Sequence, residues 1–249
     1  MSKRSISRIR LDRLVVERGL VSSRERARAL ILSGSVLVND TVADKAGSLV
    51  ASDCRLRIRG EDNPYVSRGG LKLKGALDFF NVDVKNLVVL DVGASTGGFT
   101  DCLLQEGASR VYALDVGYGQ IDWKLRTDDR VVLFERTNIR HFDPALLSDD
   151  IDMVVVDVSF ISLKLVLPVL HSFLGSGTGL LALVKPQFEA GKSDVGKGGV
   201  VRSEEVRDRV VRDVVRFAGE TGFQVTGTCD SPLIGPAGNR EYFLYAFRE

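Results

Sequence analysis

Residues 87–101 read LVVLDVGASTGGFTD and are the strongest indication of the fold class. It begins with an apolar run typical of a buried strand, and a turn rich in glycine follows directly. The turn lacks the GxGxxG spacing of dinucleotide-binding proteins, and Asp91 would place a negative charge near a pyrophosphate. Asp91 and the glycine backbone suit a cationic amino acid better. The stretch therefore predicts an α/β sheet with a ligand site at the carboxyl end of this strand.

The rest of the chain repeats this alternation of apolar runs and helical segments. Such an alternation predicts a doubly wound, parallel sheet. The last two apolar runs have no helix between them, which fits a terminal hairpin with one antiparallel strand. We expect an α/β fold with a mostly parallel, seven-stranded, Rossmann-like sheet of the methyltransferase rather than the dehydrogenase type. The expected strands are 87–92, 110–116, 131–134, 151–158, 179–185, 223–229 and 241–247, and the expected helices include 71–80, 163–173 and 203–218.

The N-terminal part differs from the rest in charge. The formal net charge of the chain is +1, but residues 1–60 carry +7 and the remaining residues carry −6. A basic head on a mildly acidic body indicates a polyanionic partner for the head.

The same part has the pattern of a small α+β domain. Apolar positions 11, 14 and 15 predict a helix that ends at Gly19. A second helix is expected to begin at an N-cap Ser22, with Glu25 reaching back, and to end at Gly34. Alternating residues at 35–44, with a turn at Asn39-Asp40, and the short run 56–58 predict strands.

Arginine dominates the positive charge of this domain. Guanidinium groups suit phosphate oxygens and base stacking, although a solvated charged face is the simpler alternative. The segment LDRLVVERGLVSSRERARALILSGSVLVN (11–39) resembles the small RNA-binding domain with an αL motif found in a ribosomal small-subunit protein, pseudouridine synthases and tyrosyl-tRNA synthetases. This resemblance implies that the domain binds structured RNA. The candidate RNA-binding residues are Arg10, Arg13, Arg18, Arg24, Arg26 and Arg28.

The polar segment 60–66 marks the boundary between two domains. It contains Pro64, which disfavours helix at Asn63, so we interpret it as an interdomain linker. The chain is expected to divide into a basic RNA-binding domain at 1–59 and a larger α/β domain at 67–249.

No membrane or metal partner is expected. The apolar runs are shorter than the roughly 18 residues of a spanning helix, and the N-terminus lacks the apolar core of a signal peptide, which favours a cytoplasmic protein. The cysteines at 54, 102 and 229 form no CxxC pair and are expected to be free thiols. His141 and His171 have no second ligand at metal-site spacing. We expect a monomer.

Two further polar residues follow successive strands. Asp115 ends the second strand, where a carboxylate can accept both ribose hydroxyls of an adenosine. Asn138 follows the third strand and could contact the adenine edge, with Val116 or Tyr118 against the ring. The alternative is that Asp91 and Asp115 only cap the turns that follow them. The candidate donor-binding residues are Ser67, Asp91, Gly93, Ala94, Ser95, Thr96, Gly97, Gly98, Phe99, Thr100, Asp115, Val116, Asn138 and Asp157.

Four charged residues are expected at the same sheet edge, namely Lys72, Asp157, Lys185 and Glu241. Transfer of a methyl group to a ribose hydroxyl needs that hydroxyl deprotonated as it attacks. A lysine accepts the proton only in its uncharged form, which burial and a second lysine favour and neighbouring carboxylates oppose. Each residue taken alone could equally be structural.

The motifs of the larger domain resemble a known family. LDVGASTGGFTD resembles the first motif of S-adenosylmethionine methyltransferases of the FtsJ superfamily, although Ser95-Thr96 stand where Ala-Pro is common. SRGGLKL (67–73) and the four charged residues resemble the Lys-Asp-Lys-Glu tetrad of FtsJ-type 2'-O-methyltransferases. The whole chain resembles the TlyA, or hemolysin-A-like, family, with Tyr65 where some relatives have tryptophan. This resemblance implies S-adenosylmethionine as donor and a ribose 2'-hydroxyl of ribosomal RNA, in either subunit and on cytidine, as acceptor.

Three alternatives stay open at this point. DVSF (157–160) stands where amino-methyltransferases of bases carry Asn/Asp-Pro-Pro-Tyr, but the prolines are missing. A non-catalytic RNA-binding or ribosome-assembly protein with a degenerate methyltransferase domain is the second, and a lytic protein is the third. The segment 185–202, rich in glycine and lysine, is expected to be a mobile loop over the substrate.

Overall fold

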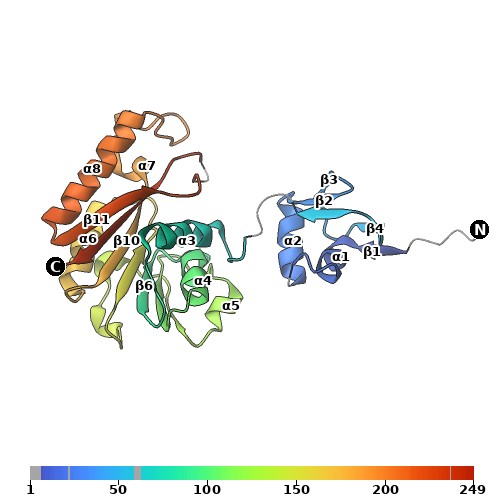
Figure 1. Ribbon diagram of the computed structural model, residues 1–249, viewed down its shortest axis with the longest axis horizontal. Helices are drawn as coiled ribbons and strands as arrows, with labels where there is room; N and C mark the ends of the chain where they lie inside the picture. The colour runs from blue at the N-terminus through green and yellow to red at the C-terminus, as the bar shows by residue number, and fades with distance from the viewer. Residues whose placement is uncertain (1–6, 22, 59–62, 236) are drawn as a thin grey trace, which may run out of the picture. The chain divides into compact units, whose positions relative to one another are not determined.

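The computed structural model describes residues 7–21, 23–58, 63–235 and 237–249. The chain forms two compact units, Met1–Pro64 and Tyr65–Glu249 (Figure 1). Residues 60–62 of the expected linker lie outside the described residues.

The larger unit is built on one seven-stranded sheet. Its strand order is β11-β12-β10-β9-β6-β7-β8, and β12 runs in the opposite direction to the other six strands. The expected doubly wound sheet with one antiparallel C-terminal strand is therefore confirmed. The strands are β6 (Val88–Val92), β7 (Arg110–Leu114), β8 (Val131–Phe134), β9 (Met153–Val156), β10 (Gly179–Val184), β11 (Phe223–Asp230) and β12 (Tyr242–Arg248).

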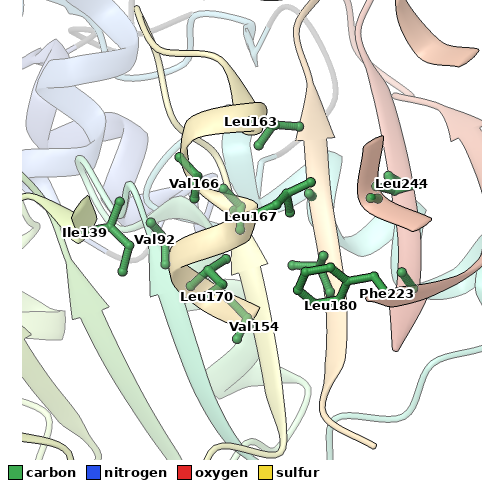
Figure 2. Packing of buried hydrophobic residues seen from close by; sticks show 14 of the residues in the cluster. Val92, Ile139, Val154, Leu163, Val166, Leu167, Leu170, Leu180, Phe223 and Leu244 are labelled. Carbon is green, nitrogen blue, oxygen red and sulfur yellow. The ribbon is translucent and has the colours of Figure 1, made fainter. Parts of the chain in front are cut away.

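Helices cover both faces of this sheet, because successive residues of each central strand point to opposite sides. Val154 and Val156 pack beneath α6 and α8, whereas Val155 packs beneath α3 and α4. Figure 2 shows the first of these cores, with Leu167 and Leu170 of α6 over the strands. The helices are α3 (Arg68–Phe80), α4 (Gly98–Gln105), α5 (Trp123–Arg126), α6 (Leu167–Phe173), α7 (Pro186–Glu189) and α8 (Glu204–Glu220).

Two expected helices differ in extent from the sequence prediction. The helix expected at 71–80 begins earlier, at Arg68, because the Ser67 hydroxyl accepts a hydrogen bond from the Gly69 amide and caps it. The helix expected at 163–173 is split into a 3-10 turn at Leu163–Leu165 and α6, which has Pro168 in its first turn. Proline cannot donate the amide hydrogen that a continuous helix would need there.

The smaller unit combines two helices with short strands around a core of Leu11, Val15, Ala27, Ile31 and Val36. Asn39 and Asp40 both have positive φ and form the expected hairpin turn. The expected N-cap Ser22 lies outside the described residues, and that prediction is wrong, because Ser23 caps the second helix. The elements are β1 (Arg8–Arg10), α1 (Leu11–Glu17), α2 (Arg24–Leu32), β2 (Val36–Val38), β3 (Thr41–Ala43), β4 (Leu49–Ala51) and β5 (Leu56–Ile58).

Candidate functional site

The turn after β6 approaches its neighbours more closely than any side chain would allow. Gly93 has a φ of +92°, and a Cβ placed there would lie 2.5 Å from the carbonyl oxygen of Asp157. A Cβ on Gly98 would lie 2.2 Å from Ser67 Oγ. Glycine at these two positions therefore lets the turn lie against the ends of β9 and α3. The result is a backbone cradle at the carboxyl edge of the sheet.

Asp91 lies beneath this turn rather than in an open cavity. Its side chain is fully buried, Oδ2 accepts a 2.6 Å hydrogen bond from the Thr100 hydroxyl, and Oδ1 has no hydrogen-bond partner. Burial, together with the nearby charge of Asp157, raises the pKa of Asp91 to about 7. A cation close to the turn would favour its ionised form.

Asp115 holds the two loops that meet at the end of β7. Oδ2 accepts a hydrogen bond from the Ser95 amide at 2.8 Å, and Oδ1 accepts one from the Gly117 amide at 2.6 Å. This is the capping role that the sequence left open as the alternative. A carboxylate oxygen has a second lone pair, so the same group can still accept hydrogen bonds from a ligand.

Two cavities meet at the turn. The first, about 370 Å³, is lined by Ser67, Arg68, Gly69, Lys72, Gly93, Ala94, Ser95, Thr96, Gly98, Phe99, Asp157 and Ile234. The second, about 800 Å³, has among its lining residues Gly93, Ser95, Asp115, Val116, Gln120, Thr137, Asn138, Arg140, Asp157, Ser159, Phe160 and Phe188. Gly93, Ser95 and Asp157 line both cavities. A third cavity of about 570 Å³ lies at the starts of β9 and β10 and contains none of the expected site residues.

Most of the candidate donor-binding residues line these two cavities, but three do not. Asp91 and Thr100 are completely buried, and Gly97 lies at the start of α4 with its Cα facing Leu125. These three support the turn from below. Tyr118 also lies outside both linings, where its ring stacks under the Arg136 guanidinium at 4.3 Å.

The four charged residues form two ion pairs at this edge. Lys72 Nζ donates to Glu241 Oε2 at 2.5 Å, and both residues are buried. Lys185 Nζ lies 2.6 Å from Asp157 Oδ1 without hydrogen-bond geometry, and it donates to Ser159 Oγ at 2.8 Å. Lys72 and Asp157 line the first cavity. Their partners, Glu241 and Lys185, lie directly behind them and are buried.

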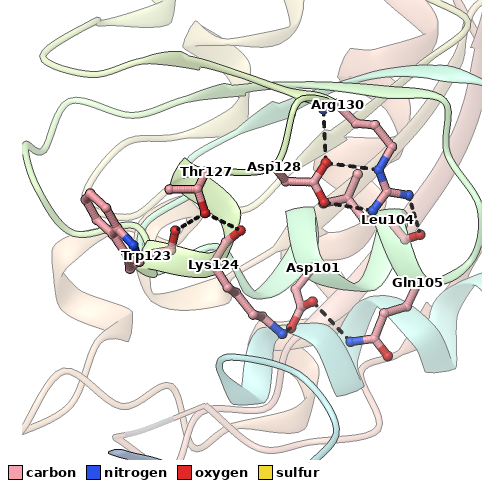
Figure 3. A network of polar contacts seen from close by, with 8 residues as sticks. All are labelled: Asp101, Leu104, Gln105, Trp123, Lys124, Thr127, Asp128 and Arg130. Atoms are coloured by element: carbon pink, nitrogen blue, oxygen red, sulfur yellow. Dashed lines mark hydrogen bonds and ion pairs between the residues drawn. The ribbon is translucent and has the colours of Figure 1, made fainter.

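A polar network fixes the elements around the turn (Figure 3). Asp101 on α4 accepts hydrogen bonds from Lys124 Nζ at 2.9 Å, from Gln105 and from the Val66 amide. Asp101 thereby joins α5 and the segment before α3 to the helix that carries the turn.

The segment 185–202 is hydrogen-bonded to neighbouring elements near both of its ends, and its expected mobility stays a prediction. Glu189 accepts hydrogen bonds from the Ser162 hydroxyl and the Leu163 amide. Asn239 is 1% exposed and binds the backbone twice, accepting from the Val201 amide at 2.9 Å and donating to the Gly199 carbonyl at 2.8 Å. This second anchor lies two residues before Glu241.

Sequence reasoning missed several residues that line the cavities. Phe160 is 90% exposed, has a φ of +64° and packs against Phe188 with ring centroids 5.1 Å apart. Ile234 comes from the β11–β12 connection, and Arg68 donates to its carbonyl oxygen. Phe160 follows shortly after the end of β9, and an aromatic residue at that place in the sequence could have indicated a cavity-lining position. Nothing in the local sequence marks Ile234, because only the tertiary fold brings it there.

The candidate RNA-binding arginines fall into two groups. Arg10, Arg24 and Arg28 converge on the buried carboxylate of Asp12. The others have separate partners: Arg13 pairs with Glu17, Arg18 donates to the Ser52 carbonyl, and Arg26 donates to the Asn63 carbonyl.

Among the described residues, no group of three or more His, Cys, Asp or Glu could hold a metal ion. The three cysteines are free thiols. In the same part of the chain, no helix has the length and apolar character to cross a membrane.

The strand order, the glycine turn and the charged edge together define a Rossmann-like methyltransferase. The FtsJ-like methyltransferase family matches residues 65–248, and the S4 domain family matches residues 9–53. The chain belongs to the FtsJ-like methyltransferase family and carries an S4 domain at its N-terminus.

Individual relatives are similar over most of the chain. YqxC of Bacillus subtilis, which is named as an rRNA methyltransferase, is 48% identical over 95% of this chain and 84% of the YqxC chain. A Mycobacterium tuberculosis protein named 16S/23S rRNA (cytidine-2'-O)-methyltransferase TlyA is 47% identical over 96% of this chain and 89% of its own. A solved structure from Streptococcus thermophilus that carries a hemolysin name is 42% identical, with a TM-score of 0.77 over 98% of this chain and 90% of that one.

Proposed function

We propose that this chain transfers the methyl group of S-adenosylmethionine to a ribose 2'-hydroxyl of ribosomal RNA, with cytidine as the modified nucleotide. The observation that carries the proposal is the pair of buried lysine–carboxylate contacts beside the glycine cradle. A hydroxyl is a weak acid, so the reaction needs a proton acceptor and a positive environment for the developing oxyanion.

The residues around the turn fit this donor. Asp115 would accept the ribose hydroxyls of the adenosine, and Val116, which is 69% exposed, would cover the adenine with Asn138 at its edge. Backbone groups from Gly93 to Gly98 would hold the amino-acid part, with the buried charge of Asp91 favouring its ammonium through the turn. The bound donor supplies an electrophilic methyl group on a sulfonium centre.

The four charged residues would deprotonate and orient the acceptor. We assign Lys185 as the proton acceptor, because its partners Asp157 and Ser159 both line the cavity where donor and acceptor would meet. Lys72, held by Glu241 in the neighbouring cavity, would stabilise the negative charge on the attacking oxygen. The two ion pairs keep both lysine side chains in place before the substrate arrives. Lys185 must first lose its own proton to solvent, because only the uncharged amine can accept the proton of the hydroxyl.

The names of the relatives and the S4 domain support ribosomal RNA as the acceptor. The M. tuberculosis relative's name gives 16S/23S rRNA and cytidine. We propose the same substrate for this chain. We also propose that the protein acts as a monomer in the cytoplasm, and sedimentation analysis of the purified protein tests its oligomeric state.

The deciding experiment measures transfer of labelled methyl groups to purified ribosomal subunits, followed by mapping of 2'-O-methylation. We expect labelled ribose on cytidine and a loss of about 100-fold or more in kcat for Lys185→Ala, which is the lower range for a missing general base. Continued methylation of RNA with 2'-deoxycytidine at the mapped position would instead indicate base methylation. Full activity of Lys185→Ala would contradict its role as base.

A further inference from the structure

Three arginine side chains of the S4 domain share one buried carboxylate. Arg10 Nε and Nη2 each donate to Asp12 at 3.1 Å, and Arg24 Nη2 donates to Asp12 Oδ2 at 2.8 Å. Arg28 Nε lies 3.8 Å from the same oxygen. The Asp12 side chain is 0% exposed, whereas the arginine side chains are 45%, 53% and 58% exposed.

The charges do not cancel in this cluster. Three guanidinium groups on one carboxylate leave a net charge of +2 at the surface. The hydrogen bond from Arg10 is the main reason that the pKa of Asp12 lies far below its ordinary value, so the carboxylate stays ionised in the pH range of a cell. Each guanidinium has five N–H donors, of which Arg10 uses two and Arg24 one for Asp12, while Arg28 makes only the 3.8 Å ionic contact. Donors therefore remain on all three for a second anion.

The backbone brings the four residues together from three elements. Arg10 ends β1, Asp12 lies in the first turn of α1, and Arg24 and Arg28 lie one turn apart on α2. The Asp12 amide donates to the Ala46 carbonyl, which fixes the start of α1. The carboxylate is therefore a rigid point on which three flexible side chains are held.

We propose that Asp12 is a positioning residue that fixes Arg10, Arg24 and Arg28 as one preformed site for the phosphodiester backbone of the substrate RNA. The proposal rests on the RNA substrate proposed above. Long arginine side chains lose conformational freedom when they bind, and a carboxylate that already orders them lowers this loss. Arg13 differs, because its charge is balanced by Glu17 at 2.6 Å.

Asp12→Asn separates geometry from charge. It raises the net charge of the cluster to +3, so if charge alone mattered, RNA would bind more tightly and with a steeper salt dependence. If Asp12 positions the arginines, the variant binds RNA more weakly despite the added positive charge. We expect KM for ribosomal RNA to rise roughly three- to tenfold, the equivalent of one lost charge-assisted contact, with little change in kcat.

The full-length protein is used throughout, with RNA titrations at several salt concentrations. Arg24→Gln and Arg28→Gln are expected to raise KM as well. Each should make the negative slope of log affinity against log salt less steep by about 0.7 to 0.9. Arg55→Gln is the control of equal charge change, because Arg55 precedes β5 and pairs with Asp40 rather than with Asp12. Circular dichroism identifies any variant that fails to fold. If Asp12→Asn fails to fold, the two arginine variants still test whether this cluster binds RNA.

The outcomes distinguish the two proposals. A wild-type protein that methylates no ribosomal RNA contradicts the proposed function. Wild-type activity combined with tighter RNA binding by a folded Asp12→Asn, or with equal losses for Arg24→Gln and Arg55→Gln, overturns the role of Asp12 alone.

Discussion

At the scale of single residues, the site depends on close backbone approach and on buried charge. The glycine turn is shaped by contacts that begin at the Cβ position, and the two lysines are held by carboxylates from distant parts of the sequence. Substitutions in the glycine turn are therefore expected to affect donor binding, and substitutions of the two lysines are expected to affect catalysis.

Gly93→Ala is expected to disrupt the donor site. The new Cβ would lie 2.5 Å from the Asp157 carbonyl oxygen at a φ of +92°, so the turn or the end of β9 must shift. Gly119→Ala is the matched control, because Gly119 also has a positive φ but has no atom within 4 Å of its added Cβ. Both changes add backbone strain of about 1 kcal/mol or more. Isothermal titration should show a large loss of S-adenosylmethionine affinity only for Gly93→Ala, and equal losses would refute this explanation.

Asp91 is expected to make stability fall as pH rises from about 4 to 7. Its pKa is about 7 in the folded protein, against about 3.9 when unfolded, so the folded state binds more protons in this range. The free energy of unfolding then decreases by up to about 1.4 kcal/mol per pH unit and levels off above pH 7. Urea unfolding at a series of pH values measures the slope. Asp91→Asn should remove this contribution, and an unchanged slope would show that other groups cause it.

At the scale of elements, helices and loops at the carboxyl edge of the sheet are tied together by single polar side chains. Asp101 joins α4 to α5, Glu189 joins α7 to the 3-10 turn at Leu163–Leu165, and Asn239 joins the 185–202 segment to the start of β12. These contacts make the carboxyl edge of the sheet one connected surface.

Asn239→Ala is expected to release the 185–202 segment. It leaves the Val201 amide and the Gly199 carbonyl without their partner, at about 1–3 kcal/mol for each group that stays buried. We expect faster hydrogen exchange at 196–202, a lower Tm and a reduced kcat, because Glu241 follows two residues later. Asn239→Asp keeps the acceptor for Val201 and loses the donor to Gly199, so an intermediate exchange rate is expected. Unchanged exchange in both variants would contradict the anchoring role.

At the scale of the whole molecule, the two units differ in net charge and in the sites that they contain. Residues 1–60 carry a net charge of +7, and the larger unit contains the cavities and the charged edge. RNA binding and donor binding are therefore expected to respond differently to salt.

Raising the salt concentration should weaken RNA binding far more than donor binding. Each phosphate contact contributes about −0.7 to −0.9 to the slope of log affinity against log salt, whereas a small donor at the proposed site would release few counterions. Measuring KM for RNA and Kd for the donor between low and physiological salt tests this expectation. Equal salt dependence of the two would contradict the division.

Local sequence patterns were enough to predict the sheet, its one antiparallel strand and the segments that carry the site. These follow from local signals, since apolar periodicity and glycine turns depend on neighbouring residues. Three-dimensional packing was needed to place Asp91 beneath the turn, to pair Lys72 with Glu241 and Lys185 with Asp157, and to bring three of the six candidate arginines to Asp12. The physical reason is that burial and ion pairing depend on distances between residues far apart in the chain, which no local pattern encodes.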